Sequence, residues 1–460
     1  MVLEKDYGFY RYKKSMAKAI YTFGAGSMTE MVLPTSVIEV RRYVKAEDSI
    51  PVFVRPILDV QRNPLTQEVI HSEIKELTDN PIYLDFEQGK FILIVSPPGS
   101  GKTFLMRGMA GELIEAGYSV VCLADQKNDF YWSKYPVQDK FMRIMPPWRK
   151  PKALPMACIS PMYIKYKERD MKFPDDVIFF KLSLKDLTAE DLIIAMGLEF
   201  GSPPANLLQM AWNPEHPPKT LPQLYERIQT VDIKSFLREQ NIETRDKIGV
   251  FASQTVNALM NRLVRLHKEQ FIGDENNIDI IDIIKRGYFL DLCLFDNSIY
   301  AYHTAYVYNL IRRIYQEKKK GGKLQGMRVA FLFPDIGTFV LPNKKDTVSK
   351  QLILRDLISL GRAKGIYVIG DTQNLAQIPP EAMYQVQTWI FYGTISGMDL
   401  EMIAKINKKK YADIREMVDK YGRDLMTKFP MRGAILWENV RGTRLGFCPA
   451  PSSFHGEQSA

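Results

Sequence analysis

The segment that most constrains the fold is a glycine-containing turn between an apolar run and a helix-forming run. Its residues are Ser96, Pro97, Pro98, Gly99, Ser100, Gly101, Lys102 and Thr103, and they directly follow the apolar run Phe91–Val95. They match the pattern G-x-x-x-x-G-K-[ST], except that Ser96 replaces the first glycine. Because strand, loop and helix occur in the order that this pattern requires, the sequence predicts a P-loop.

Each residue type in the predicted loop has a chemical role. Gly99 and Gly101 permit the tight turn that directs backbone N–H groups at phosphate oxygens, and the helix N-terminus adds its positive end. Lys102 is expected to bind the β- and γ-phosphates, and the Thr103 hydroxyl is expected to ligate Mg²⁺. The sequence therefore predicts that ATP and Mg²⁺ bind at residues 96–103.

From about residue 86 onward, short apolar runs alternate with helical stretches. The runs span 91–95, 119–124, 177–180, 287–292, 329–333, 365–369 and 389–392. Strands that are apolar on both faces are typical of a sheet covered by helices on both sides, although runs this short also suit buried helices. Their β-branched and aromatic content favours strands, so we expect an α/β fold.

Local patterns divide the chain into three expected domains. Residues 1–85 carry β-rich runs at 36–44 and 50–58 and are expected to form a small β-rich N-terminal module. Residues 186–284 contain the capping pattern Thr188-x-x-Asp191 and apolar residues at helical spacing, which predicts an all-α insertion. The core then comprises 86–185 and 285–460. Residues 146–161 hold five prolines, and an exposed irregular loop is the simpler interpretation of them.

Composition excludes several classes of protein. Hydrophobic residues make up 46% and charged residues 25%, values that exclude a disordered or fibrous chain. No apolar run reaches the roughly 18 residues of a membrane-spanning helix, and the N-terminus lacks signal-peptide features, so a cytoplasmic protein is expected. The cysteines form no C-x-x-C pair, and neither a zinc cluster nor a disulfide framework is expected. They are Cys122, Cys158, Cys293 and Cys448.

The net charge of +9 permits a polyanionic partner, and its distribution is more informative. Residues 312–328 hold seven Lys and Arg against Glu317, and residues 405–432 hold nine against four acidic residues. For either run alone, a solvated helix face is the simpler interpretation. Two such runs in one half of the chain favour a nucleic-acid partner.

The acidic residues for hydrolysis are harder to assign. The run Val329–Phe333 is followed by Pro334 and Asp335, so one carboxylate occurs where two are usual. In one register Asp335 lies on the metal side and the base is missing. In the other, Pro334 takes the metal side and Asp335 the catalytic position, while a turn without a role is the simpler alternative. Asp129, which follows the run 119–124, is a candidate for metal or water binding or a loop carboxylate without a role.

Two further candidates lie near the run 365–369. Gln373 follows this run in Asp371-Thr-Gln and is placed to sense the γ-phosphate. Arg362 precedes the run, and from the residues alone it is either a surface arginine or an arginine finger that serves a neighbouring subunit.

Together these motifs resemble the HerA/FtsK superfamily of ring-forming P-loop ATPases. Its members include archaeal HerA translocases, the ATPases and coupling proteins of conjugative secretion, and some viral packaging motors. The resemblance extends over about 86–445 and rests on the order of its motifs. They lie at 96–103, 125–130, 220–224, 254–263, 287–292, 331–337, 361–365 and 371–373.

The resemblance implies a RecA-like core with a mostly parallel sheet and a homohexameric ring. It aligns Asp335 with a catalytic glutamate and Pro334 with an aspartate, and it implies that Arg362 is a trans-acting finger and Gln373 a sensor. Pro334 cannot ligate metal, so Mg²⁺ would rest on Thr103, the phosphates and water, with Asp129 as a further candidate. Slow or conditional ATP hydrolysis is therefore the alternative expectation.

Two functions follow from these features. The first is an ATP-hydrolysing ring motor that translocates DNA, with a nuclease, a portal or a secretion channel as its candidate partner. The second is a nucleotide-dependent structural or docking ring of a secretion, pilus or viral packaging assembly, with weak or no turnover. The two basic runs favour the first function, and the missing acid pair favours the second.

Overall fold

The computed structural model describes most of the chain from Ser49 onward and divides it into two compact units. The described residues are 49–67, 69–86, 91–126, 128–137, 145–146, 148–161, 176–213, 215–231, 253–268, 271–273, 278–294, 301–340, 357–359, 361–393, 396–421, 433–438, 442–449 and 451. The first unit, called the P-loop unit below, comprises Met1–Tyr118, Ser133–Leu154 and Tyr367–Ala460. The second unit comprises Ser119–Trp132 and Pro155–Ile366.

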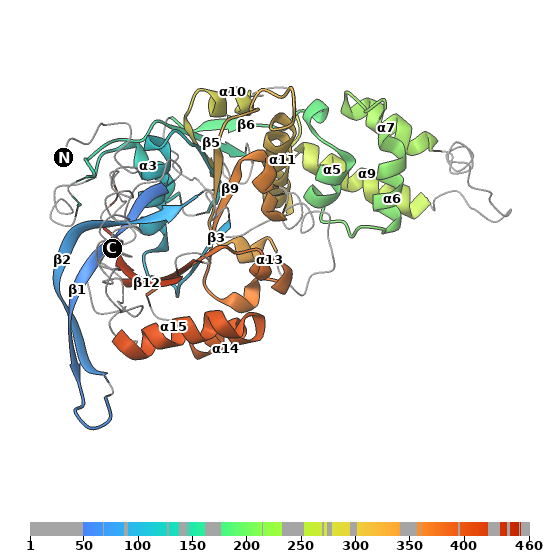
Figure 1. The fold of residues 1–460 in the computed structure, drawn as a ribbon. Helices are drawn as coiled ribbons and strands as arrows, with labels where there is room; N and C mark the ends of the chain where they lie inside the picture. Colours follow the sequence, from blue (N-terminus) through green and yellow to red (C-terminus); the bar gives the residue numbers. More distant parts are fainter. Residues whose placement is uncertain are drawn as a thin grey trace. The chain divides into compact units, whose positions relative to one another are not determined.

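The sheet of the P-loop unit combines parallel and antiparallel strands (Figure 1). In the order β2-β1-β12-β11-β10-β3-β9, its strands are Val69–Asp85, Ser49–Arg62, Gly442–Phe447, Gly433–Glu438, Thr388–Tyr392, Phe91–Val95 and Ile366–Thr372. Strand β3 pairs in parallel with both β10 and β9. All five β3 residues are buried, as expected for a strand that is apolar on both faces.

Helices cover this sheet at several places. Helix α3 (Lys102–Glu115) packs against β1, and its chain turns away at Gly117, whose φ is 81°. Helices α14 (Gly397–Ile406) and α15 (Lys408–Tyr421) pack on each other, and α15 also contacts β11 and β12. The short elements η7 (Leu375–Gln377) and α13 (Pro380–Tyr384) connect β9 to β10.

The second unit contains a parallel sheet with the strand order β8-β4-β7-β5-β6. These strands are Val329–Phe333, Ser119–Asp125, Phe289–Cys293, Met156–Pro161 and Ile178–Phe180. Helix α10 (Ile280–Lys285) packs against β4 and β7, and α11 (Ala301–Glu317) packs against β4. Three 3-10 turns lie next to strand ends. The turn η1 (Phe130–Lys134) follows β4, η4 (Ile336–Thr338) follows β8, and η6 (Gly361–Lys364) precedes β9.

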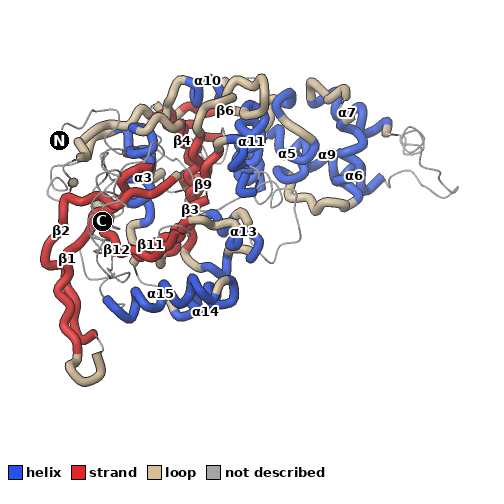
Figure 2. Tube along the Cα trace, viewed as in Figure 1, coloured by secondary structure: helices blue, strands red, loops and turns tan. Residues whose placement is uncertain are grey.

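In the described part of residues 186–284 the regular elements are helices, and Ile272 forms one isolated bridge with Leu182, which precedes this segment. Its four longer helices gather together in Figure 2, in which they are blue. They are α5 (Ala189–Ala195), α6 (Pro203–Trp212), α7 (Leu221–Thr230) and α9 (Ser253–Lys268). The capping box that begins α5 is formed as predicted, because Thr188 Oγ1 accepts from Asp191 N at 3.2 Å and Asp191 Oδ2 from Thr188 N at 3.0 Å.

The predicted α/β fold with a mostly parallel core sheet is confirmed, and each predicted apolar run forms a strand. The expected loop at 146–161 is wrong in part, because β5 occupies its second half with buried residues. Arg149 of this segment is also buried, and its Nε donates to Glu112 Oε1 at 2.6 Å. The loop therefore ends before Met156.

The compact units group residues differently from the predicted domains. The hairpin of β1 and β2 belongs to the P-loop unit, where β1 pairs with β12 at Val54 and Phe447. The run 36–44 lies outside the described residues, so the division at 85/86, 185/186 and 284/285 remains a prediction. Among the described residues, no helix combines the length and apolar character that crossing a membrane requires.

Candidate nucleotide-binding site

The predicted P-loop has the backbone conformation that its sequence pattern requires. Gly99 and Gly101 have φ values of 70° and 90°, a left-handed conformation that side-chain-bearing residues avoid. Ser96 is not among the described residues with positive φ, which explains why serine is tolerated in place of glycine. Its backbone N–H instead donates to Thr372 O at 3.1 Å and ties the loop to β9.

Helix α3 begins at Lys102, directly after the loop. Gly101 is its N-cap and provides no side-chain acceptor for the first N–H groups of the helix. A helix N-terminus of this kind attracts anions through its N–H groups and its dipole. The Ser96 and Ser100 side chains are buried and their hydroxyls contact each other, so they stiffen the loop from within.

Lys102 already points into the loop. Its Nζ lies 3.4 Å from Ser96 O, to which it donates, and 3.6 Å from Asp371 Oδ2. The Lys102 side chain is 14% exposed and that of Asp371 only 6%, so this ion pair is largely shielded from water. The ammonium is therefore held beside the loop with a carboxylate as its counter-charge.

The end of β10 also approaches the loop. A Cβ atom added to Gly101 would lie 3.7 Å from Tyr392 Oη, and one added to Gly393 would lie 3.7 Å from Ser100 Cβ. These are ordinary contact distances, so the positive φ of each glycine, and not a lack of space, disfavours larger residues there. The loop that follows β3 is thus contacted by the ends of the two neighbouring strands, β9 and β10.

The predicted site residues divide between the two units. Lys102, Thr103 and Gln373 lie in the P-loop unit, where Gln373 is exposed directly after β9. Asp129, Asp335 and Arg362 lie in the second unit. Arg362 is part of η6, and its side chain is outside the description.

Asp335 has an unusual backbone. It follows Phe333 and Pro334 at the end of β8, with φ 49° and ψ 49°, and its carbonyl accepts from Thr338 N at 3.0 Å. Non-glycine residues in this left-handed region are uncommon, and such strain is concentrated at functional sites. The half-buried Asp335 is thus a reasonable candidate for a reactive position.

Asp129 lies in the turn after β4. Asp125 Oδ1 accepts from Asp129 N at 3.0 Å, and Oδ2 accepts from Phe130 N at 2.8 Å. Burial raises the pKa of Asp125 well above its ordinary value, and the carboxylates of Asp291 and Asp129 raise it further. Asp125, the first residue of the motif at 125–130, therefore fixes the turn that carries Asp129.

The fold brings together Cys158 and Cys293, which are far apart in the sequence. Potential ligand atoms of Cys158, Asp291 and Cys293 lie within 4.8 Å of one another, and Cys293 Sγ is 3.1 Å from Asp291 Oδ2. A cysteine binds zinc as its thiolate. Burial raises the pKa of Cys293 well above its ordinary value, which favours the neutral thiol and a role in core packing.

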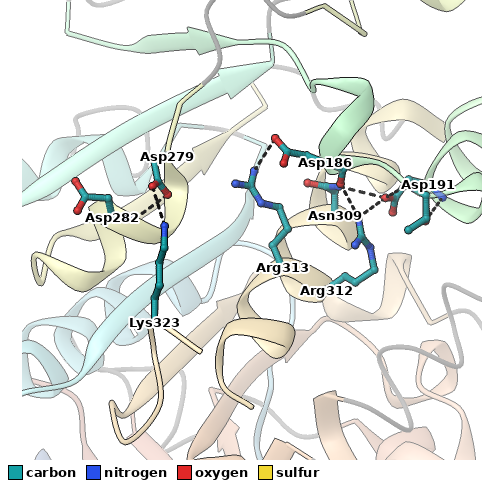
Figure 3. Close-up of polar contacts among 9 residues, drawn as sticks. Asp186, Asp191, Asp279, Asp282, Asn309, Arg312, Arg313 and Lys323 are labelled. Atoms are coloured by element: carbon teal, nitrogen blue, oxygen red, sulfur yellow. Dashed lines mark hydrogen bonds and ion pairs between the residues drawn. The ribbon is translucent and has the colours of Figure 1, made fainter. Parts of the chain in front are cut away.

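The basic run 312–328 is less available to a polyanion than its sequence suggests. Arg312 is 2.6 Å from Asp191 Oδ2, Arg313 is 3.9 Å from Asp186 Oδ2, and Lys323 is 3.4 Å from Asp279 Oδ2 (Figure 3). These three cations line a pocket of about 510 Å³ in the second unit, together with Asp186 and Asp279. Lys318 is buried and donates to Met327 O. Lys319 and Lys320 remain exposed.

The second basic run, at 405–432, also loses one expected contact. Lys408 and Lys409 are exposed at the start of α15, whereas Lys410 is only 5% exposed. The Lys410 ammonium lies 4.5 Å from the ring centroid of Trp389 and 4.2 Å from that of Trp437. The sequence predicts that Lys408, Lys409 and Lys410 contact phosphate together, and this is wrong for Lys410 because its ammonium is buried over the two tryptophan rings. Residues 422–432 lie outside the description.

Comparisons with known proteins give structural matches alone. No protein-family model and no curated protein matches this sequence. The genome packaging NTPase B204 of Sulfolobus turreted icosahedral virus 2, in complex with ATP-gammaS, is 10% identical, with a TM-score of 0.33 over 78% of this chain and 97% of its own.

Two further solved structures also match. VirB4 of Thermoanaerobacter pseudethanolicus is 12% identical, with a TM-score of 0.44 over 81% of this chain and 93% of its own. The plasmid coupling protein TrwB, in complex with ADP and Mg²⁺, is 12% identical, with a TM-score of 0.47 over 90% of this chain and 100% of its own. These TM-scores lie below 0.5, so the fold assignment rests on this chain's own strand order and P-loop.

Proposed function

We propose that this chain is an ATP-hydrolysing ring motor that translocates DNA. The observation that carries the nucleotide part is the loop after β3, in which two left-handed glycines precede α3 and Lys102 points back at the loop. The motor part is supported by the resemblance of the sequence to HerA/FtsK ATPases and by the exposed lysines that remain in both basic runs.

The residues of the P-loop unit suit a bound triphosphate. Loop N–H groups and the α3 N-terminus would hold its oxygens, and Lys102 would exchange Ser96 O and Asp371 for the β- and γ-phosphates. Thr103, in the first turn of α3, has the hydroxyl that this class of site uses to ligate Mg²⁺. Bound Mg²⁺ supplies positive charge that neutralises the phosphate oxygens.

The remaining roles come from the resemblance. Asp335 would accept a proton from the attacking water, and Gln373 would sense the γ-phosphate. Asp129 is retained as a candidate for orienting water. Arg362 would place its charge on the transferring phosphoryl group of a neighbouring subunit, in a ring that we propose to be a hexamer.

DNA would be gripped through its backbone, independently of sequence, because a motor must pass over every base. The exposed lysines offered for this contact are Lys319, Lys320, Lys408 and Lys409. A nuclease, a portal or a secretion channel would receive the moving DNA.

The second candidate function is a nucleotide-dependent docking ring with weak or no turnover. It is favoured by Pro334, which has no side-chain ligand atom where the family carries an aspartate. The two candidates differ in whether DNA accelerates ATP hydrolysis.

The test is ATP turnover measured with and without double-stranded DNA. Turnover that rises with DNA in the wild type, and falls by roughly 10²-fold or more in Lys102→Ala, is the expected result. Lys152→Ala is the matched control, since Lys152 is an exposed lysine of the same unit that pairs with Glu115 at the far end of α3. ATP binding without measurable turnover would favour the docking ring.

A further inference from the structure

The carboxylate beside Lys102 belongs to Asp371, the first residue of the motif Asp371-Thr-Gln. Asp371 is 4% exposed and lies near the end of β9. Parallel pairing places it beside Ile94, and its neighbour Thr372 beside Val95, the last residue before the loop. A buried carboxylate therefore lies directly under the site at which a triphosphate would bind.

This position creates a charge problem when nucleotide binds. Without nucleotide, the Lys102 ammonium and the Asp371 carboxylate balance each other across 3.6 Å. A triphosphate would draw the ammonium to its own oxygens. The Asp371 carboxylate would then lose the Lys102 ammonium while phosphate anions came close, and repulsion between anions costs far more in a protein interior than in water.

A divalent cation removes this problem. Carboxylate, hydroxyl and phosphate oxygens are the hard ligands that Mg²⁺ prefers. Thr103 supplies the hydroxyl and the nucleotide would supply the phosphates, but Pro334 supplies no acid. Asp371 belongs to the same compact unit as Thr103 and Lys102.

We propose that Asp371 is the metal-side carboxylate of this site, holding the nucleotide-bound Mg²⁺ directly or through its water while Lys102 binds the phosphates. This inference rests on the proposed nucleotide binding but not on hydrolysis or DNA movement. It assigns to β9 the acid that related ATPases are expected to carry before the residue corresponding to Asp335.

A simpler role for Asp371 is a latch that only holds Lys102 in the absence of nucleotide. The two roles predict different effects of removing the carboxylate. A latch competes equally with metal-free and metal-bound ATP, so its loss strengthens both. A metal ligand repels metal-free ATP and attracts the metal-bound form, so its loss strengthens the first and weakens the second.

The experiment measures ATPγS affinity by calorimetry in excess EDTA and in excess Mg²⁺. The quantity compared is the enhancement by Mg²⁺, which is the ratio of the two affinities. For Asp371→Asn, we expect tighter binding in EDTA and an enhancement reduced about tenfold to a hundredfold relative to wild type. A Mn²⁺ titration followed by electron paramagnetic resonance in the presence of ATPγS should show the same loss of metal affinity.

Two further variants sharpen the result. Asp419→Asn removes an exposed carboxylate of α15, which pairs only with Arg415 among the contacts that the structure describes, and should leave the enhancement unchanged. Asp371→Glu keeps the charge and should restore part of the enhancement. It also allows the test to proceed should the Asp371→Asn protein fail to fold, because a reduced but measurable enhancement in Asp371→Glu is then the expected result.

The proposal is overturned if Asp371→Asn, or Asp371→Glu in its place, keeps the wild-type enhancement. Equal strengthening of binding in EDTA and in Mg²⁺ would identify the latch instead. Failure of the wild-type protein to bind ATPγS under either condition would instead remove the proposed nucleotide function, and with it this inference. The two failures are therefore distinguishable.

Discussion

Lys410 is a lysine whose ammonium lies over two neighbouring indole rings. The faces of Trp389 and Trp437 attract the cation, but burial lowers the pKa of Lys410 to about 8. Trp437 is held in turn by a hydrogen bond from its Nε1 to Asp413 Oδ2, 3.2 Å away on α15. The side chain therefore fastens α15 to β10 and β11.

This environment predicts a pH dependence of stability. The pKa of Lys410 is lower in the folded protein than the roughly 10.4 of an unfolded chain, so between these values the unfolded chain binds more protons. Its contribution to the free energy of unfolding should therefore rise between about pH 8 and 10.5, by roughly 1 to 2 kcal/mol after allowance for solvent screening.

Urea unfolding of the wild type and of Lys410→Met at pH 7.5 and pH 10 measures this contribution. The free energy of unfolding of the wild type, relative to that of the variant, should be higher at pH 10 than at pH 7.5. The contributions of other titrating groups are the same in both proteins and cancel in this difference. Parallel behaviour of the two proteins would show that the folded and unfolded pKa values are equal.

At Asp335, a substitution can remove the carboxylate charge without changing the left-handed backbone conformation. Asparagine tolerates the left-handed conformation nearly as well as aspartate, so Asp335→Asn should preserve the turn after β8. If Asp335 activates water, nucleotide affinity stays near wild type and turnover falls by about 10² to 10⁴. Weaker nucleotide binding with normal turnover would place Asp335 on the metal side instead, and would count against Asp371 in that role.

At the scale of single elements, the first turn of α15 contains a natural control for DNA binding. Lys408 and Lys409 are exposed and Lys410 is buried, although the three are consecutive. If this turn grips phosphates, Lys408→Gln with Lys409→Gln should flatten the log–log salt dependence of DNA affinity by about 2 units. Lys410→Met should leave that slope unchanged. Equal slopes in all three proteins would show that the turn is only a solvated face.

Strands were predictable where burial made both faces apolar. β3, β8 and β10 are such strands, and each matches a predicted run. β5 was missed because prolines precede it and Pro161 ends it, so its composition indicated a loop. β12 was missed because it contains Arg444, whose burial depends on partners that the local sequence does not reveal.

Those partners also correct a reserve assignment. The sequence offers Arg441 and Arg444, which follow the last predicted strand, as reserve candidates for the arginine finger. Arg444, however, pairs with Glu438, and its Nη1 donates to Tyr83 O at 3.3 Å. It is 6% exposed, so it is a structural residue of the sheet. The other reserve, Arg441, lies outside the described residues.

In the candidate site, too, local patterns were predictable from the sequence and contacts between distant residues were not. The P-loop is a local pattern, and its glycine conformations and helix start were predictable from eight consecutive residues. The Lys102–Asp371 pair was not, because only the parallel pairing of β3 with β9 brings the two residues together. Such contacts depend on strand order, which a single sequence does not state.

At the scale of the whole molecule, the role proposed for Arg362 requires an assembly. If Arg362 completes the site of a neighbouring subunit, an isolated copy binds ATP but scarcely hydrolyses it. Arg362→Ala should then bind ATP and assemble normally, with turnover reduced by about 10³ to 10⁵, because the finger's charge meets the transition state more than the ground state. Lys364→Ala is the matched control. Lys364 is a cation of the same turn, and its Nζ lies 4.9 Å from the Tyr315 ring centroid.

Mixing two inactive variants tests the composite site directly. Arg362→Ala subunits keep an intact P-loop, and Lys102→Ala subunits keep an intact Arg362. In a randomly mixed ring, about a quarter of the head-to-tail interfaces pair the two intact residues. Turnover should therefore recover in part when the variants are assembled together, and stay negligible in each alone.

Absence of recovery in rings proven to be mixed counts against a finger that acts between subunits, with one exception. A motor whose subunits must hydrolyse ATP in strict sequence also stalls at its first defective interface. Mixing wild type with Lys102→Ala separates the two cases, because a strictly sequential ring loses nearly all turnover with one defective subunit, whereas independent sites lose it only in proportion.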